Sequence, residues 1–226
     1  GKPTSVDGNR RRGVGLGIHC NADVGEDDSE AWVKLTADGR ALVLAAVSEA
    51  GQGQRSSLVK MAAEVLNLPL DHVNMSFPDT DGNPFEFALV GSRGTFTVGS
   101  AVIQAAEDAR RQLLEMAAPV MKLKPEELDT EDGYIFEIEN PKNRIPWRKA
   151  TGITSTILGK GRFNEDFTLS NFLMTFVEVE VDITTGKVSL IKVLNSAGCG
   201  QVISPAALQG QSVSYTHLTL PTKRIV

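Results

Sequence analysis

The sequence predicts a mixed α/β fold built from strand–helix units and a β-hairpin. Three observations lead to this fold class: two segments with helical periodicity, a hairpin with a strongly apolar second arm, and a late segment that alternates polar and apolar residues. The order strand, helix, strand, helix and hairpin favours a mixed architecture over an all-α or all-β one. The chain has 226 residues, 41% of them apolar, which is enough for one large domain or two small ones.

The first strands lie in the N-terminal part of the chain. Residues 13–20 alternate small and apolar side chains and are typical of a strand. Residues 31–36 and 41–47 form a hairpin, with Asp38 and Gly39 as turn residues. Because apolar residues occupy both faces of the second arm, we expect that strand to be covered on both sides.

Two segments have the periodicity of amphipathic helices. In the first, which ends before Pro69, one face carries Leu58, Met61, Ala62, Val65 and Leu66. The second runs from about residue 97 to 117, and its apolar face carries Val98, Val102, Ala105, Ala109, Leu113 and Met116. Ser92 and Thr95 are candidates to cap the second helix, which is the structural alternative to an anion contact by Arg93.

The remaining segments are short strands and loops. Proline and glycine interrupt the stretch after the second helix, and residues 172–182 alternate cleanly between valine and acidic side chains. We expect strands at residues 72–77, 134–139, 172–182 and 188–194. We expect loops at residues 78–91 and 150–168.

Four segments describe the expected domain organisation. Residues 1–12 are polar and glycine-rich, which predicts a connector. Residues 13–150 form a first α/β subdomain, and residues 151–211 form part of a second one. Residues 212–226 resemble the translation of an adapter used in sequencing libraries, so we expect them to be foreign to the natural protein. The alternative is an ordinary polar C-terminus.

Composition excludes several classes of function. The net charge is −5 and no basic stripe is present, which argues against a nucleic-acid partner. No apolar run approaches the roughly 20 residues of a membrane span. Cys20 and Cys199 lack the spacing of a zinc or iron–sulfur site, so we expect no metal held by protein ligands, and a reduced, cytoplasmic protein.

Two glycine-rich loops each open a helix, about forty residues apart. The first, residues 51–57, is not a P-loop, because it lacks the Gly-Lys-Ser/Thr ending. Its backbone N–H groups and the helix dipole favour a polar or anionic acceptor, although a helix-opening turn without a ligand is the alternative. In the second loop, residues 91–95, Arg93 is suited to an anion. Together the loops predict one cleft for a large anionic cofactor.

The order of motifs resembles the large subunit of the molybdenum hydroxylases, the xanthine dehydrogenase and aldehyde oxidase family. The resemblance runs from about Arg12 to Gln211. It rests on Asp38-Gly39, Glu49-Ala-Gly-Gln-Gly53, Ala63-Glu64-x-Leu66 with Pro69, Pro78-Asp-Thr80, Gly91-Ser-Arg-Gly-Thr95, Gly99-x-Ala101, Val177-Glu-Val-Glu-Val-Asp182 with Thr185-Gly186, Pro205 and Gly210-Gln211. No single motif is decisive, but their shared order and spacing make the case.

The resemblance implies an oxidoreductase that hydroxylates small aldehydes or N-heterocycles with oxygen from water. The implied cofactor is molybdopterin carrying molybdenum, either as the bare pterin or, as a bacterial-type split subunit favours, as the cytosine dinucleotide form. Electrons would leave through [2Fe–2S] clusters to FAD on partner domains or subunits. In such enzymes the protein supplies placement and hydrogen bonds, and the cofactor supplies the chemistry.

The resemblance also assigns cofactor-binding residues. Gly51, Gln52 and Gly53 match the loop that contacts the pterin. Gly91 matches a position whose amide faces the molybdenum, with Ser92 and Arg93 beside it, and Gln211 matches a cofactor-binding glutamine in the last loop. No catalytic residue is assigned, because the family's catalytic glutamate lies downstream of the matched segment. The alternative function is a non-catalytic α/β binding or assembly module on the same scaffold.

Overall fold

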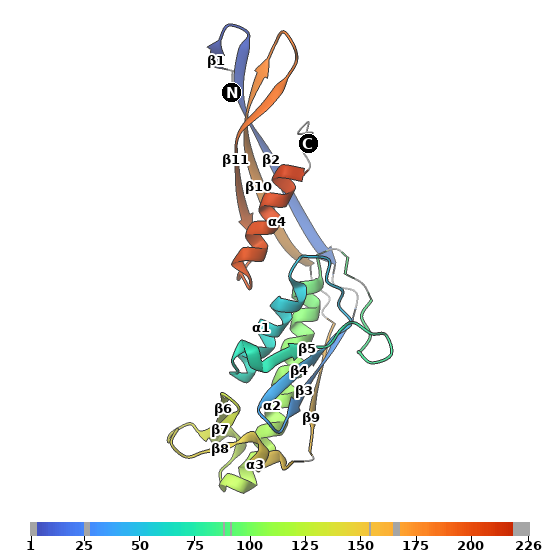
Figure 1. Cartoon of the computed structure of the whole chain (residues 1–226), viewed down its shortest axis with the longest axis vertical. Coiled ribbons are helices and arrows are strands. Elements are labelled where there is room, and N and C mark those ends of the chain that lie inside the picture. The colour runs from blue at the N-terminus through green and yellow to red at the C-terminus, as the bar shows by residue number, and fades with distance from the viewer. Residues whose placement is uncertain are drawn as a thin grey trace. The chain divides into compact units, whose positions relative to one another are not determined.

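The chain folds into two compact units in a computed structural model, which describes residues 4–24, 28–87, 89–90, 92–153, 155–164 and 168–218 (Figure 1). The larger unit comprises residues 24–167, and the smaller comprises residues 1–23 together with 168–226. These boundaries differ from the expected subdomains, 13–150 and 151–211. The difference arises because an N-terminal strand pairs with strands from the C-terminal part, which sequence order alone does not indicate.

The larger unit is built on a four-stranded sheet in the order β5-β4-β3-β9. Strands β3 (Ser29–Thr36) and β4 (Arg40–Leu44) are antiparallel neighbours, which confirms the predicted hairpin. The short β5 (Val73–Met75) lies parallel to β4, inside the strand predicted at residues 72–77. Strand β9 (Ile157–Phe163) pairs antiparallel with β3.

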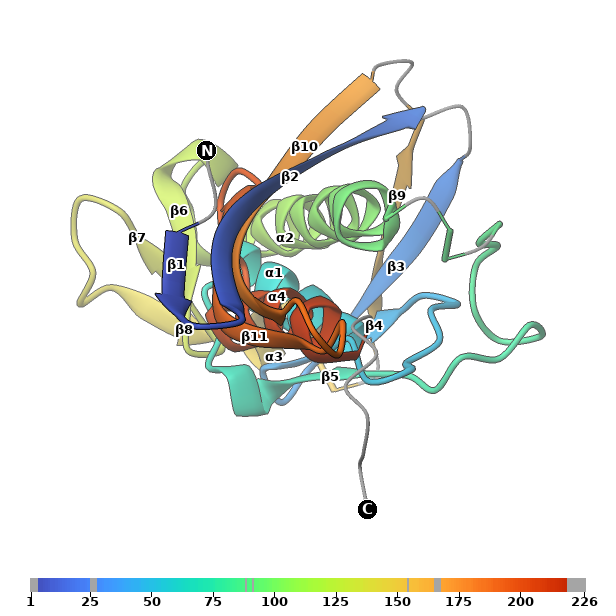
Figure 2. The same cartoon turned by 90° about the horizontal axis from the view of Figure 1, so that it is seen from above.

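Both predicted helices are present in this unit. Helix α1 (Gln54–Leu66) ends at Asn67, and α2 (Gly99–Met121) lies alongside β9 and β3 (Figure 2). The second helix begins with a π-helical turn, η2 (Gly94–Val98), and no side chain caps it, so the predicted capping by Ser92 and Thr95 is wrong. It also continues past Pro119, which interrupts only the last turn.

Strand β9 replaces part of the loop predicted at residues 150–168. It crosses α2 so closely that a Cβ on Gly159 would lie 2.1 Å from the carbonyl oxygen of Ala105, and one on Gly161 would lie 2.0 Å from that of Ala101. Only glycine fits such an approach. Gly159 and Gly161, which fall in the predicted loop, are therefore the residues that allow this strand to pack against the helix.

The smaller elements complete the larger unit. The strand predicted at residues 134–139 is confirmed as β7 (Tyr134–Glu137), and two flanking strands that were not predicted pair with it, β6 (Leu128–Glu131) and β8 (Arg144–Pro146). The short helices are η1 (Leu70–His72), η3 (Pro125–Glu127) and α3 (Trp147–Thr151).

The core of the larger unit lies on one face of its main sheet. Burial alternates along β3 and β4, so that Ala41 and Val43 are buried while Leu42 and Leu44 are partly exposed. The prediction that the second arm of the hairpin is covered on both sides is therefore wrong. Helices α1 and α2 add their apolar faces to the same core, including Leu58 and Leu113.

The smaller unit is a four-stranded sheet in the order β1-β2-β10-β11, followed by a helix. Its elements are β1 (Thr4–Asp7), β2 (Arg10–Val24), β10 (Thr168–Asp182), β11 (Val188–Gly198) and α4 (Pro205–Leu218). The strands predicted at 13–20, 172–182 and 188–194 are confirmed, and the connector predicted over residues 1–12 is wrong, since strands cover most of residues 4–12.

Helix α4 continues to Leu218, past residue 212, where the adapter-like segment was expected to begin. In the part of the chain that the structure describes, no helix is long and apolar enough to span a membrane.

Candidate functional site

The first glycine-rich loop is organised by a carboxylate. Glu49 Oε1 accepts hydrogen bonds from the backbone N–H groups of Gly51 and Gly53, both at 2.9 Å, and its Oε2 accepts one from Arg55 at 3.2 Å. Gly51 and Gly53 have φ angles of 99° and 75°, in the left-handed region that favours glycine. The loop therefore depends on both its glycines and its acidic residue.

Glu49 is ionised at neutral pH. Desolvation alone would raise its pKa, but the backbone N–H groups of Gly53, Arg55 and Gly51 outweigh that effect and hold the pKa of Glu49 below its usual value. The carboxylate thus supplies the negative charge that the N-terminus of α1 favours. The polar acceptor that the sequence predicts for these N–H groups is thus a side chain of the protein itself, Glu49.

Gln52 folds its side chain back onto the same loop. Its Oε1 accepts a hydrogen bond from the Ala50 N–H at 2.7 Å, and its Nε2 donates to the Ser48 carbonyl at 3.1 Å. Both bonds lie within the loop and the side chain is only partly buried. The amide is therefore at the surface, and it can exchange these bonds for others without disturbing the core.

The two helix-opening loops meet, as their sequences predict. A Cβ on Gly94, at the start of η2, would lie 2.8 Å from Gln54 Oε1, at the start of α1, and 2.9 Å from a methyl carbon of Leu89. Thr95 Oγ1 also lies 3.5 Å from Gln54 Oε1. Glycine at position 94 is what allows the beginnings of the two helices to lie against each other.

Arg93 faces the inside of the chain rather than the surface. Its guanidinium donates to Glu86 Oε1 at 2.6 Å and to Ser29 Oγ at 3.0 Å, and the side chains of Arg93 and Glu86 are 4% and 2% exposed. This buried pair fastens the second loop to the start of β3. Its predicted role toward an anion stays a prediction, and the contacts give it a structural role in addition.

The other predicted residues have different surroundings. Ser92 is exposed and has a left-handed backbone with φ 65°, whereas Gly91 lies outside the described residues. Gln211 is exposed on α4 in the smaller unit, so the expectation that it lies in a loop is wrong.

Arg55 provides a positive charge beside the first loop. Its guanidinium donates to the Met75 carbonyl at 2.9 Å and lies 5.1 Å from the centre of the Phe77 ring. Among the residues that the structure describes, no carboxylate forms an ion pair with it. Gln54, the first residue of α1, is thus followed by the Arg55 cation. The ionised Glu49 carboxylate lies in the loop that precedes the helix.

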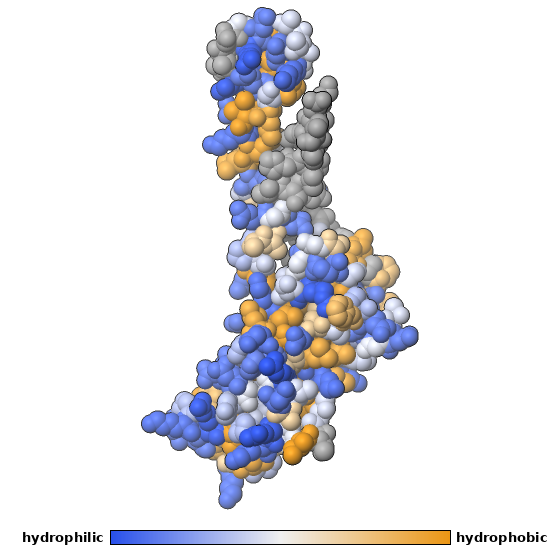
Figure 3. All heavy atoms as spheres, viewed as in Figure 1, coloured by the Kyte–Doolittle hydropathy of each residue, from blue (hydrophilic) through white to orange (hydrophobic). Residues whose placement is uncertain are grey.

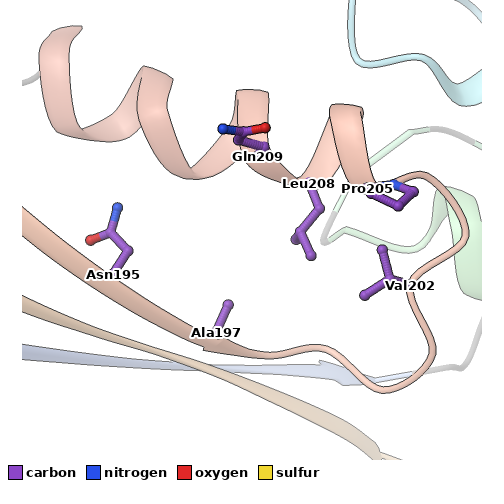
Figure 4. Close-up of a pocket in the computed structure, with 6 residues that line it drawn as sticks. All are labelled: Asn195, Ala197, Val202, Pro205, Leu208 and Gln209. Atoms are coloured by element: carbon purple, nitrogen blue, oxygen red, sulfur yellow. The ribbon is translucent and has the colours of Figure 1, made fainter.

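A separate hollow lies within the smaller unit, between β11 and α4. Its volume is about 450 Å³, and its lining includes Asn195, Ala197, Leu208 and Gln209. Figure 4 shows Leu208 and Ala197 pointing toward each other across it. Gln209 lies two residues before Gln211, so the hollow adjoins the part of α4 for which the resemblance implies cofactor binding.

Two glycine-containing loops meet at the starts of two helices in a mixed α/β fold, an arrangement that gathers polar loop groups in one place. The family model described as molybdopterin cofactor-binding domain matches residues 2–213. The chain belongs to this family, as the resemblance in its motifs implies.

Curated relatives carry consistent names. The chain is 26% identical over 217 residues to the putative xanthine dehydrogenase molybdenum-binding subunit of Escherichia coli K12, covering 90% of this chain and 29% of that protein. It is 25% identical over 206 residues to the nicotine 6-hydroxylase large subunit of Paenarthrobacter nicotinovorans, covering 85% and 25%. The chain thus spans less than a third of the length of these relatives.

A solved structure shares the fold. Quinoline 2-oxidoreductase from Pseudomonas putida 86 superimposes with a TM-score of 0.79 and 20% identity, over 90% of this chain and 29% of that one. This likeness confirms the mixed α/β fold class.

Sequence reasoning missed three residues of this region. Glu49 carries only a weak signal, because acidic residues are favoured near a helix N-terminus, but it lies several residues before Gly53, which precedes the helix. Gln54 and Glu86 carry no local signal, because their roles depend on Gly94 and Arg93, which are distant along the chain or across a loop.

Proposed function

We propose that this chain is part of the molybdopterin-binding subunit of an oxidoreductase that hydroxylates aldehydes or N-heterocycles with oxygen from water. The observation that carries the proposal is the contact of Gln54 with Gly94, which joins two loops that the family resemblance assigns to one cofactor. Membership of the molybdopterin cofactor-binding family supports it. The alternative, a binding module without cofactor, has no observation in its favour.

The residues of the two loops fit such a cofactor. The Gln52 side-chain amide is at the surface, and the Nε2 of the enclosed Gln54 amide has no hydrogen-bond partner. Amide groups suit the mixed donors and acceptors of a pterin edge. The residues of these two loops that would hold the cofactor are Gly51, Gln52, Gly53, Gly91, Ser92 and Arg93, and Gln211 stays a separate prediction within the smaller unit.

The cofactor, when bound, supplies the redox and oxygen-transfer chemistry at its molybdenum. The chain positions it. Glu49 fixes the first loop through three backbone N–H groups, so that Gln52 is presented at a defined place. Arg93 and Glu86 fix the second loop from inside, so that Ser92 stays at the surface. Loops held in advance lose less conformational entropy when a ligand binds.

Finer features of the assembly belong to the same proposal. We propose the cytosine dinucleotide form of the cofactor, with [2Fe–2S] and FAD on partner subunits or domains and a small aldehyde or heterocycle as substrate. One relative is named as the gamma subunit of the 6-hydroxypseudooxynicotine dehydrogenase complex, which supports a subunit arrangement of this kind. Both cysteines are free and exposed thiols, which supports a cytoplasmic location.

The experiment is a replacement of Gln52 in the full-length subunit, expressed together with cofactor-synthesis enzymes. Gln52→Ala is expected to lower the molybdenum and pterin content several-fold while leaving the unfolding midpoint unchanged, because its hydrogen bonds lie within a surface loop. The matched control is Gln104→Ala, an exposed glutamine of α2, which should keep full content. A wild-type subunit without molybdenum or pterin would refute the proposed function.

A further inference from the structure

One face of the sheet in the smaller unit carries apolar side chains. Arg10 and Arg12 of β2 both form ion pairs with Glu180 of β10, so these three side chains lie on one face. Because side chains alternate along a strand, and because Phe176 pairs with Leu194 of β11, apolar residues of all three strands share that face. They are Val14, Leu16, Ile18, Phe172, Phe176 and Leu194, with exposed fractions from 39% to 68%.

The opposite face of this sheet is the one that helix α4 covers. The hollow between β11 and α4 is lined by Asn195 and Ala197, whose side chains alternate with that of Leu194. An antiparallel sheet that faces water on one side normally carries polar residues there. A contiguous apolar surface is instead typical of a contact with another part of a protein. The exposed face therefore has the composition of an interface.

The glycines of β2 agree with this interpretation. Gly13, Gly15 and Gly17 alternate with the apolar residues of the strand, and a Cβ on any of them would meet nothing within 4 Å. In β9 the same spacing, at Gly159 and Gly161, admits the backbone of α2. Glycine inside a strand weakens it and often marks such a close approach. The composition of β2 is thus that of a strand covered on both faces.

The cover has to be present whenever the smaller unit is folded. None of the side chains that the structure describes in this unit is fully buried, whereas a domain normally has a core of its own. The chain covers only 29% of the related Escherichia coli subunit, so most of such a protein lies outside it. A cover from the same polypeptide is available from folding onward, whereas a separate partner would leave the face open until assembly.

We propose that the apolar face of β2, β10 and β11 is an interface within the subunit, covered by an apolar surface of the part of the same polypeptide that lies outside this chain. The ion pairs of Glu180 with Arg10 and Arg12 form the polar rim of this interface. The inference goes beyond the proposed function, because it concerns how the subunit is assembled and not how it holds a cofactor.

The first test compares this chain with the full-length subunit expressed alone. Leu16→Cys places a thiol on the apolar face, and its reaction with a maleimide is followed by mass spectrometry of the peptide that contains residue 16. The reaction is expected to be at least about tenfold slower in the full-length subunit, because the reagent reaches a covered side chain only through local opening. The matched control is Gln104→Cys on α2, an exposed polar position, which is expected to react equally fast in both proteins.

Three outcomes of this test would overturn the inference. The first is equally fast labelling of Leu16→Cys in this chain and in the full-length subunit. The second is slow labelling in this chain together with a dimer in sedimentation, which would show that a second copy covers the face. The third is protection that arises only when separate partner subunits are added to the full-length subunit.

The second test uses Leu16→Lys, whose charge an apolar cover would have to bury. In this chain the unfolding midpoint in urea is expected to equal that of the wild type, because Leu16 is 54% exposed. In the full-length subunit the yield of folded, soluble protein is expected to fall several-fold. An unchanged yield would contradict the proposal, and so would an equal loss in this chain. Neither test measures cofactor content, so the proposed function does not depend on their outcome.

Discussion

The two units of the chain differ in how they are stabilised. In the larger unit, side chains from β3, β4, α1 and α2 form a core whose members include the fully buried Val33, Val43, Leu58 and Leu113. In the smaller unit, none of the side chains that the structure describes is fully buried. Three apolar residues of β2, Val14, Leu16 and Ile18, are each more than half exposed. Figure 3 shows that apolar residues also form part of the surface of the smaller unit.

This difference shows that the two units depend on different interactions. The larger unit gains stability from apolar burial and close packing. The smaller unit relies more on the long antiparallel pairing of β10 with β11 and on ion pairs of Glu180 with Arg10 and Arg12. Replacements that disturb packing should therefore act strongly in the larger unit and weakly in the smaller one.

The largest effect is expected at the crossing of β9 and α2. Gly161→Ala places a Cβ 2.0 Å from a backbone oxygen of α2, so the two elements must separate. We expect a loss of about 4 kcal/mol or more in the free energy of unfolding. The measurement is urea unfolding followed by tryptophan fluorescence, because both tryptophans, Trp32 and Trp147, lie in the larger unit.

The matched glycine in the smaller unit is Gly15 on β2. A Cβ at this position would meet nothing within 4 Å, so Gly15→Ala is expected to change the free energy of unfolding by no more than about 0.5 kcal/mol. Here unfolding is followed by far-UV circular dichroism, whose signal includes the strands and the helix of the smaller unit. Similar losses for Gly161→Ala and Gly15→Ala would contradict the contrast between the units.

A smaller effect is expected from the ion pairs. Glu86→Gln removes a carboxylate that is 2% exposed and bound to the buried Arg93, so we expect a loss of about 3 kcal/mol. Glu180→Gln removes the partner of two arginines that are 60% and 40% exposed, and the loss should not exceed about 1 kcal/mol. Denaturant unfolding of both variants checks this, and a greater loss from Glu180→Gln would reverse the comparison.

The smallest effect concerns pH. The pKa of Glu49 is lowered by backbone N–H groups that outweigh its desolvation, and the pKa of Asp182 is lowered by the N–H groups of Thr184 and Thr185. A lowered folded-state pKa means that each carboxylate stabilises the fold above its ordinary pKa, 4.5 for Glu49 and 3.8 for Asp182, and that this stabilisation is lost as pH falls through the folded-state value.

Variants separate the two carboxylates. Glu49→Gln is expected to flatten the acid side of the stability curve seen by tryptophan fluorescence, and Asp182→Asn should leave that curve unchanged, because Asp182 lies in the smaller unit. The unfolding midpoint measured from pH 7 to pH 3 provides the check. An unchanged curve for Glu49→Gln would show that the carboxylate does not stabilise the first loop.

Local patterns in the sequence were sufficient for most of the elements. The spacing of Leu58, Met61 and Leu66 identified α1, and Asp38-Gly39 between apolar arms identified the β3–β4 hairpin. The alternation of valine and acidic residues identified β10. These patterns succeed because side chains a few residues apart share a helix or strand face, so periodicity along the chain reports directly on burial.

Contacts between distant segments settled the rest. Gly159 and Gly161 lie in a strand that pairs with β3, and the close passage of α2 requires glycine at both positions. Gln54 likewise lies where only glycine fits at position 94. Arg93 is buried because Glu86 and Ser29 lie opposite its guanidinium. Such positions follow from tertiary packing and charge pairing, whose free energies depend on neighbours far apart in the chain, whereas helices and hairpins follow from neighbours close in it.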